Sequence, residues 1–318
     1  MHPRTVHMRK YPKLFHCLVF GLVASLAGGS LRAAPPGSTF GADFFPNVVL
    51  TNQHGEQVHF YTDLLKDKLY LINFIYTRCK DTCPLETAKL KKLQKALGDR
   101  VGKDIFFYSI SVDAQHDKPE ELKKFAAKFG VGPGWQFLAG RKEDVRLIRK
   151  KLGMYRDDGK PEKGLNEHNI NILFGNDNTS QWIKRSPFED TEALVRLFTE
   201  RLSYSLPQYA KAADSSQAPV ATAQSEGAEL FQSYCESCHS LDTQDGIGPG
   251  LAGRIKQRDK IWLKRWIKEP NRLLDEHDLT AEALFYQYNQ INMPNLRLTD
   301  QQVEKIVNYL EENENLTQ

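Results

Sequence analysis

The sequence predicts an α/β domain followed by an all-α domain, with a flexible linker between them. Up to about residue 205, short apolar runs typical of buried strands alternate with amphipathic patterns typical of helices. Residues 206–224 are rich in Ala, Ser, Gln and Pro and show neither helical nor strand periodicity, as is typical of a linker. Residues 225–318 show helical patterns only. The expected domains are therefore 40–205 and 225–318.

The α/β part alternates strands and helices in chain order. Residues 69–76 form a nearly continuous apolar run, which predicts a strand buried on both faces. A helix should follow from Pro84 and end at Gly98. The other expected elements are a hairpin (47–50 with 57–60), strands at 104–112 and 136–138, helices at 118–129 and 143–152, a second hairpin (169–174 with 181–184) and a helix at 190–202. This succession is the thioredoxin-like order.

The all-α part should contain three helices. Two are expected at 227–234 and 261–268, and Pro270 should end the second. The third should begin at Thr299, with Gln302 placed to complete a capping box.

The N-terminus predicts export. Residues 1–33 fit a signal peptide or an N-terminal anchor, because basic residues precede an apolar stretch at 14–27 and small residues follow it. That stretch is short for a membrane span of ~20 residues, so a cleaved signal is favoured and an anchor remains open. Export would place the chain in the periplasm or on the outer face of the cytoplasmic membrane, where disulfides can form.

The charge pattern excludes one class of function. The formal net charge of +3 comes from basic residues that precede the first acidic residue, Asp43. The rest of the chain has no basic stripe with interleaved aromatic residues, so no nucleic acid is expected as a partner.

Two close pairs of cysteines lie beyond the signal segment, and the second pair predicts a haem. Residues 235–239 read CESCH. The thiols of Cys235 and Cys238 can add to the haem vinyl groups, and the adjacent His239 can bind the iron. Half a zinc site is the alternative. It would need two more ligands nearby, and His277 is the only other Cys or His in 225–318.

Met293 is the expected second iron ligand. It lies in an Asn-Met-Pro loop before the last helix, which is a poor place for a residue that fills a core. A His/Met pair occupies both axial positions and leaves electron transfer as the natural role. With Gly-Pro-Gly-Leu at 248–251 and a helix bearing Trp262 and Trp266, this part resembles the class I cytochromes c. The resemblance implies one covalent haem c.

The first pair, Cys79 and Cys83, lies where the buried strand passes into the predicted helix. Open α/β folds place their sites there. Cysteines four apart on one helical turn can form a disulfide, and their two soft sulfurs suit Cu(I). A thiol at a helix N-terminus is also more reactive, because the helix dipole stabilises its thiolate. A structural disulfide remains the alternative, although closing so short a loop adds little stability.

The α/β part departs from ordinary thioredoxins in its CxxxC spacing and in having Asn-Glu-His, without proline, at 166–168. With these residues it resembles the Sco/SenC family of copper-binding, thioredoxin-fold proteins. The matching blocks, in order, are Cys79 to Pro84, Ser111 to Asp113 with Asp117 and Pro119, Gly134 to Gly140, and His168. The resemblance implies that Cys79, Cys83 and His168 hold one copper ion. The pattern departs at Ala114, where the family commonly has proline.

The combined resemblance predicts an α/β thioredoxin-like domain followed by an all-α cytochrome c domain. By resemblance, the chain would deliver copper to respiratory cytochrome oxidase or help its maturation. Its partners would be an oxidase subunit or another copper or thiol acceptor, together with a redox partner for the haem. Haem iron and copper each move one electron, whereas a dithiol moves two, so we expect the haem to exchange electrons with the copper.

Two other functions remain open. Cys79 and Cys83 could be the redox-active pair of a thiol-disulfide reductase, or the pair could act as a redox sensor without turnover. His168 favours copper, because dithiol exchange needs no third ligand. A metallochaperone and electron-transfer protein is therefore favoured over an enzyme.

Overall fold

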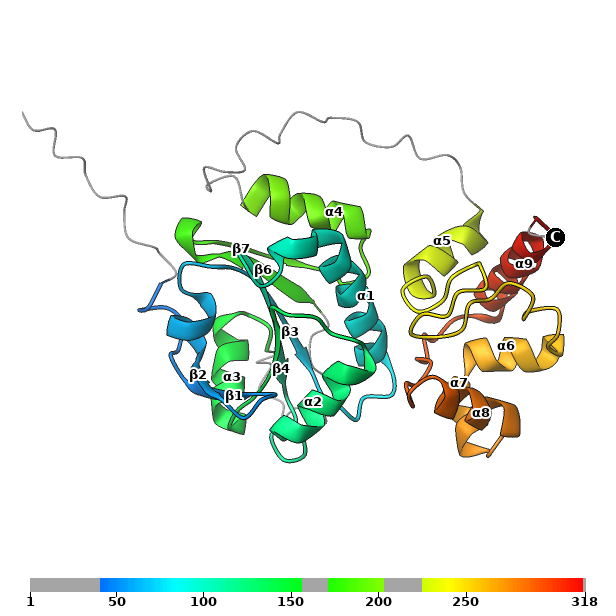
Figure 1. Cartoon of the computed structure of the whole chain (residues 1–318), viewed down its shortest axis with the longest axis horizontal. Coiled ribbons are helices and arrows are strands. Elements are labelled where there is room, and N and C mark those ends of the chain that lie inside the picture. The colour runs from blue at the N-terminus through cyan, green and yellow to red at the C-terminus, as the bar shows by residue number, and fades with distance from the viewer. Residues whose placement is uncertain (1–40, 156–170, 203–224, 317–318) are drawn as a thin grey trace, which may run out of the picture. The chain divides into compact units, whose positions relative to one another are not determined.

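The computed structural model describes residues 41–155, 171–202 and 225–316 (Figure 1). The predicted signal or anchor at 1–33, the predicted linker at 206–224 and His168 lie outside the described residues. Among the described residues, no helix is both long and apolar enough to cross a membrane.

The first part is built on one seven-stranded sheet with the order β2-β1-β5-β4-β3-β6-β7. Strands β3, β4 and β5 run parallel, β6 is antiparallel to β3, and the outer strands pair in antiparallel fashion. The strands are β1 (Val49–Asn52), β2 (Gln57–His59), β3 (Leu69–Ile75), β4 (Ile105–Ser111), β5 (Trp135–Ala139), β6 (Ile172–Asn176) and β7 (Gln181–Arg185).

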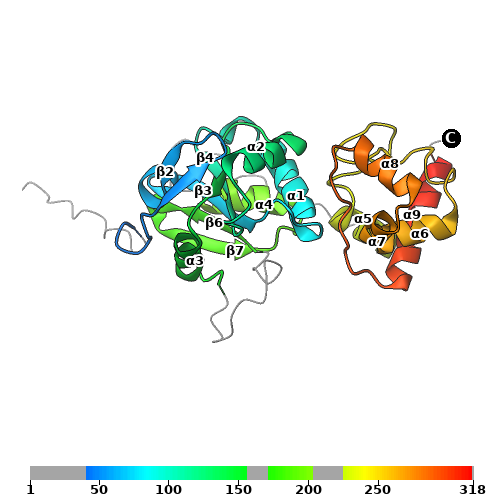
Figure 2. The ribbon, with the colours of Figure 1, turned by 90° about the horizontal axis from the view of Figure 1, so that it is seen from below.

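Helices cover both faces of this sheet. The described helices and helical turns of this part are η1 (Phe60–Leu65), α1 (Thr82–Leu97), η2 (Gly98–Arg100), α2 (Pro119–Lys128), α3 (Lys142–Lys151), η4 (Asp177–Thr179), α4 (Thr191–Arg196) and η5 (Leu197–Leu202). Figures 1 and 2 show α3 on one side of the sheet and α1 and α2 on the other. The predicted thioredoxin-like fold is confirmed.

The alternation of side chains along β3 explains the two layers. Leu69 and Leu71 face α1, α2 and α4, whereas Tyr70 and Ile72 face η1 and α3. All seven residues of β3 are buried, as its apolar run predicted.

Most expected elements are confirmed, with shifts at their ends. Helix α1 begins at Thr82 and not at Pro84, because the first turn of a helix tolerates a proline. The expected strand at 57–60 ends at His59, and Phe60 starts the π-helical turn η1. The second hairpin turns later than expected, since β6 extends to Asn176.

The second part contains five described helices where three were expected. They are α5 (Glu226–Tyr234), α6 (Lys260–Lys268), α7 (Pro270–Asp275), α8 (Leu279–Gln287) and α9 (Asp300–Leu316). Helices α7 and α8 were missed. Pro270 ends α6 as predicted, but it is also the first residue of α7. Asp278 caps α8 by accepting a hydrogen bond from the Ala281 N–H.

The core of this part lies around α5, α6 and α9. Phe231, Ile306 and Val307 are among its buried members. Gly227 allows α5 to approach α9, because a Cβ at this position would lie 2.3 Å from the carbonyl oxygen of Lys305. The predicted capping box is confirmed, with reciprocal hydrogen bonds between Thr299 and Gln302.

Candidate dithiol and haem sites

The structure brings Cys79 and Cys83 together at the edge of the sheet where β3 and β4 both end. Cys79 lies in the loop after β3, and Cys83 lies in the first turn of α1. Both side chains are buried. The Cys83 backbone N–H donates to Cys79 Sγ over 3.4 Å, and the Cys83 thiol donates to the same sulfur. The predicted pair therefore forms one dithiol site.

The two thiols differ in acidity. Hydrogen bonds lower the pKa of Cys79 to about 5: first that of the Cys83 thiol, then those of the Cys83 and Asp81 backbone N–H groups and of the Tyr76 side chain, while burial opposes them. The pKa of Cys83 is raised, because its proton is held by the Cys79 sulfur and its surroundings are dry. Cys79 is therefore the thiolate and Cys83 the thiol at neutral pH.

A buried network of hydrogen-bonded side chains lies beneath this site. The Asn73 side-chain amide donates to Glu86 Oε1 over 3.0 Å, and Ser109 Oγ donates to Asn73 Oδ1 over 2.6 Å. The Trp135 ring N–H donates to Ser109 Oγ over 2.8 Å. Burial raises the pKa of Glu86 to about 8, so its carboxyl is mostly protonated at pH 7.

Sequence reasoning missed this chain of polar groups. Its one visible signal was Asn73, a polar residue within an otherwise apolar strand. Glu86 sits on a helix, where a single Glu looks like a solvated surface residue until its burial is known.

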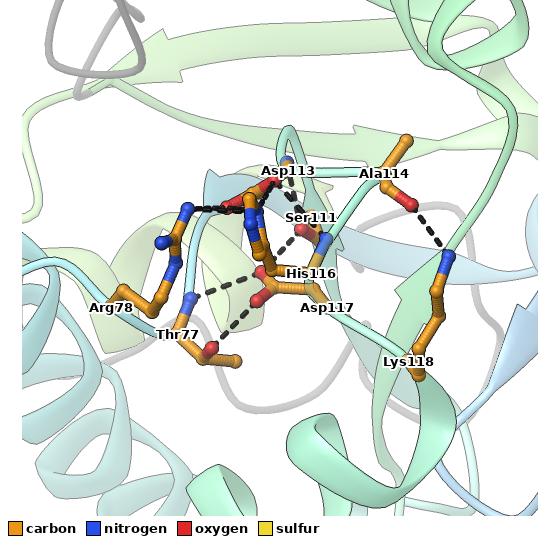
Figure 3. A network of polar contacts seen from close by, with 8 residues as sticks. All are labelled: Thr77, Arg78, Ser111, Asp113, Ala114, His116, Asp117 and Lys118. Atoms are coloured by element: carbon orange, nitrogen blue, oxygen red, sulfur yellow. Dashed lines mark hydrogen bonds and ion pairs between the residues drawn. The ribbon is translucent and has the colours of Figure 1, made fainter.

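Polar contacts also tie the loop that carries Cys79 to the loop that follows β4 (Figure 3). Asp117 accepts hydrogen bonds from Thr77, and Asp113 accepts one from Arg78 over 2.8 Å. His116 lies beside Asp113 and is 43% exposed in its side chain. The sequence pattern singled out Asp113 and Asp117 without giving them a role.

The copper site stays a prediction. His168, the expected third ligand, lies outside the described residues, and the described residues contain no group of three or more His, Cys, Asp or Glu side chains able to hold a metal ion. The described donors, a thiolate and a thiol side by side, fit a soft metal such as Cu(I).

The haem motif lies where α5 ends. The Cys238 and His239 backbone N–H groups both donate to the Cys235 carbonyl, over 3.0 and 2.9 Å. His239 Nδ1 donates to the Pro249 carbonyl over 2.9 Å, which leaves Nε2 as the metal-binding nitrogen. Burial lowers the pKa of His239, so its ring is neutral, as iron ligation requires.

The surroundings of His239 fit a haem. Two cavities open beside it, and Cys235, His239 and Met293 line both of them. Most other lining residues are Leu, Ile, Phe and Trp, as expected around a macrocycle. Gly248 makes room for the ligand ring, because a Cβ there would lie 2.6 Å from His239 Cε1. The structure thus brings both predicted axial ligands to one apolar space.

These two sites define a class of protein: a thioredoxin-fold dithiol domain joined to a c-type cytochrome domain. Comparisons with protein families agree with this description. The SCO1/SenC family model matches residues 36–199, and the Cytochrome c family model matches residues 224–314. The chain belongs to the SCO1/SenC family, and it carries a cytochrome c domain in addition.

Two curated relatives show the extent of the similarity. The chain is 41% identical over 91 residues to "SCO1 protein homolog" of Bacillus subtilis, covering 28% of this chain and 45% of the relative. It is 29% identical over 154 residues to "Protein sco1" of Schizosaccharomyces pombe, covering 43% of this chain and 57% of the relative. The chain thus spans about half the length of the curated relatives that it matches.

Solved structures of the family are similar to the first part. One is a SCO1/SenC family lipoprotein from Bacillus anthracis, with 32% identity, a TM-score of 0.44 and coverage of 50% of this chain and 94% of that one. Another is yeast Sco1 with copper bound, with 22% identity, a TM-score of 0.42 and coverage of 54% and 96%.

The cofactor prediction is confirmed at the level of the families. A cytochrome c domain carries haem c, and the SCO1/SenC family, to which the chain belongs, is a family of copper-binding proteins. The residues that hold each cofactor stay predictions.

Proposed function

We propose that this protein is exported and binds one copper ion and one haem c. It would act in the delivery of copper to respiratory cytochrome oxidase or in the maturation of that enzyme. Cys79, Cys83 and His168 would hold the copper, Cys235 and Cys238 would attach the haem, and His239 and Met293 would bind its iron. The acceptor would be an oxidase subunit or another copper or thiol protein.

The observation that carries this proposal is that Cys79 and Cys83 lie side by side as a thiolate and a thiol. A metal–thiolate bond requires a deprotonated sulfur, and Cys79 already provides one because its pKa is lowered to about 5. Only the proton of Cys83 has to leave when the metal enters. Membership of the SCO1/SenC family supports copper as that metal.

The cytochrome domain supports a second part of the proposal, which is electron exchange between the haem and the copper. Oxidation of Cu(I) to Cu(II) releases one electron, and reduction of ferric to ferrous haem takes one. The two couples therefore balance without a third reactant. A dithiol would have to release two electrons to form a disulfide, and a single haem accepts only one of them.

Rapid mixing of the full-length protein tests this proposal. Protein with reduced haem is mixed with Cu(II), and haem oxidation is followed optically. We expect one haem oxidised per copper bound in the wild type and no copper-dependent oxidation in Cys79→Ser/Cys83→Ser. Haem oxidation that does not depend on Cu(II), or that is unchanged in the double variant, would contradict the electron exchange.

A thiol-disulfide reductase is the second candidate. The observation that favours it is the asymmetry of the pair, because a thiolate beside a protonated thiol suits nucleophilic attack on a disulfide followed by resolution. Such an enzyme would reduce a disulfide substrate without metal and would retain this activity in His168→Ala. A copper protein would instead lose copper affinity in His168→Ala.

A further inference from the structure

The loop that carries Cys79 is fastened to a neighbouring loop by two buried aspartates, whose partners differ in exposure (Figure 3). Asp117 is fully buried and Asp113 is 5% exposed, but Asp113 pairs with the exposed Arg78. Both aspartates lie in the loop between β4 and α2, and their partners Thr77 and Arg78 directly precede Cys79. The two contacts can therefore be compared within one loop.

Asp117 has a complete set of hydrogen bonds despite its burial. It accepts from the Thr77 backbone N–H over 3.0 Å, from Thr77 Oγ over 2.6 Å and from Ser111 Oγ over 2.5 Å. A buried carboxylate is costly unless it is hydrogen-bonded, and bonds to an ionised acceptor are short and strong. Three donors converge on this one side chain, and two of them belong to a single residue.

The hydrogen bonds between Thr77 and Asp117 also restrict the position of Cys79. The Cys79 backbone N–H donates to the Tyr76 carbonyl over 3.2 Å, so Thr77 lies inside a tight turn that ends at Cys79. Fixing both the backbone and the side chain of Thr77 leaves this turn little freedom. The turn sets the place of Cys79 Sγ, which has to meet the Cys83 backbone N–H at 3.4 Å.

Asp113 makes a weaker contact with the same loop. Its carboxylate pairs with Arg78 at 2.8 Å and with His116 at 2.9 Å, but the side chains of these two partners are 56% and 43% exposed. Ion pairs with exposed partners contribute little, because water screens them and two long side chains must be held in place. Asp113 therefore serves as a control for Asp117, because it contacts the same loop through weaker interactions.

We propose that Asp117 is a positioning residue of the dithiol site, which holds the Thr77 turn so that Cys79 Sγ stays at the N–H donors of the α1 N-terminus. This inference rests on the dithiol site of the proposed function and adds a residue that touches neither sulfur.

Metal-free full-length Asp117→Asn and Asp113→Asn proteins test it. An Asn side chain keeps the shape but replaces one acceptor oxygen with a donor NH₂, so it cannot accept all three hydrogen bonds. The pH profile of Cys79 alkylation by iodoacetamide, read by peptide mass spectrometry, reports where the thiolate forms. The midpoint potential of the Cys79–Cys83 disulfide is measured in parallel against a glutathione buffer.

We expect Asp117→Asn to move the midpoint of the Cys79 alkylation profile up by about one pH unit. Below that midpoint, alkylation at a fixed pH would slow about tenfold, because the rate follows the fraction of thiolate. The disulfide potential should shift as well, whereas Asp113→Asn should leave both quantities unchanged. A lower melting temperature of Asp117→Asn with an unmoved profile and potential would overturn the proposal, and so would an equal shift in Asp113→Asn.

Thr77→Val keeps the test decisive if Asp117→Asn fails to fold. This variant removes only the Oγ hydrogen bond and retains the shape of the side chain and the backbone N–H contact. We expect a smaller shift in the same direction, and no shift would overturn the proposal. All these readouts use metal-free protein, so failure of copper binding or of haem–copper exchange would leave them interpretable.

Discussion

The two cysteine pairs of this chain have opposite chemical environments. Cys79 and Cys83 meet at the N-terminus of α1, and hydrogen-bond donors lower the pKa of Cys79 to about 5. Cys235 and Cys238 follow the C-terminal end of α5, and burial raises the pKa of each to about 12. A helix N-terminus stabilises a nearby anion, whereas a C-terminus does not.

The difference shows that hydrogen-bond donors and burial, more than cysteine spacing, set the acidity of a thiol. The first pair keeps a thiolate ready for a metal or a disulfide partner. The second pair is held as neutral thiols in an apolar cavity, where thioether bonds to a haem would remove them from acid–base chemistry altogether. Four predictions test this contrast, from the largest expected effect to the smallest.

Removing each pair should abolish a different cofactor. In Cys235→Ala/Cys238→Ala we expect complete loss of covalently bound haem with copper binding retained, and in Cys79→Ser/Cys83→Ser the reverse. The reason is that each pair supplies its own bonds to its own group. Haem and metal analysis of protein made in a cytochrome c-maturing host provides the measurement. Loss of both cofactors in either variant would break the contrast.

Gly248→Ala should impair haem ligation severely. The added Cβ would lie 2.6 Å from His239 Cε1, so the ring has to leave the position set by its hydrogen bond to Pro249. We expect a large loss of holoprotein or a changed iron-ligand spectrum, measured from the Soret band per mole of protein. Gly246→Ala is the control, because its Cβ would lie 3.1 Å from the Cys238 carbonyl oxygen and needs only a small adjustment. Equal effects in both variants would contradict the prediction.

Glu86→Gln should change how stability depends on pH. The pKa of Glu86 is raised to about 8 from an ordinary 4.5, so the folded protein favours the protonated form. The favourable contribution is complete below about pH 4.5 and is lost as the pH rises through 8. Each pKa unit corresponds to about 1.4 kcal/mol, so the variant should gain several kcal/mol relative to wild type across this range.

Urea unfolding of both proteins at pH 5 and pH 9 measures the change in the free energy of unfolding. Glu121→Gln, on the exposed side of α2, is the control. A constant difference between Glu86→Gln and wild type at both pH values would refute the buried, protonated carboxyl.

Tyr76→Phe should raise the pKa of Cys79 modestly. The Tyr76 side chain is one of several donors to the Cys79 sulfur, and its hydrogen bond lowers the pKa less than the others do. We expect a shift on the order of half a unit to one unit. The pH profile of iodoacetamide alkylation measures it. Tyr108→Phe removes a buried hydroxyl on the other face of the sheet and should leave the profile in place. An unchanged profile in Tyr76→Phe would show that this hydroxyl does not act on the thiolate.

The sequence predicted the elements whose pattern is strong within one segment. The apolar run of β3 and the amphipathic face of α1 located the dithiol site, and CESCH at 235–239 located the haem site. Helices α7 and α8 escaped prediction because a single residue, Pro270, ends one helix and begins the next. Helix α8 also lacks an apolar stripe of its own, since only Ala281 is buried in it.

The supporting residues of both sites could not be predicted in the same way. Glu86, Asn73 and Asp117 matter through partners on other strands and loops: Asn73 lies 13 positions from Glu86, and Thr77 lies 40 positions from Asp117. A buried carboxyl and a solvated one look the same in a sequence, and only the packing of α1 and of the β4–α2 loop distinguishes them.

The sequence by itself determined which residues can react: two thiols ahead of a helix, two thiols with a histidine, and a methionine in a loop. Those properties are covalent and local, so they are visible in order and spacing. Only the tertiary structure decided how each would behave. It made Cys79 the thiolate, left Glu86 protonated and placed His239 and Met293 around one cavity. Burial and hydrogen bonds between distant segments set these properties, and they exist only once the chain has folded.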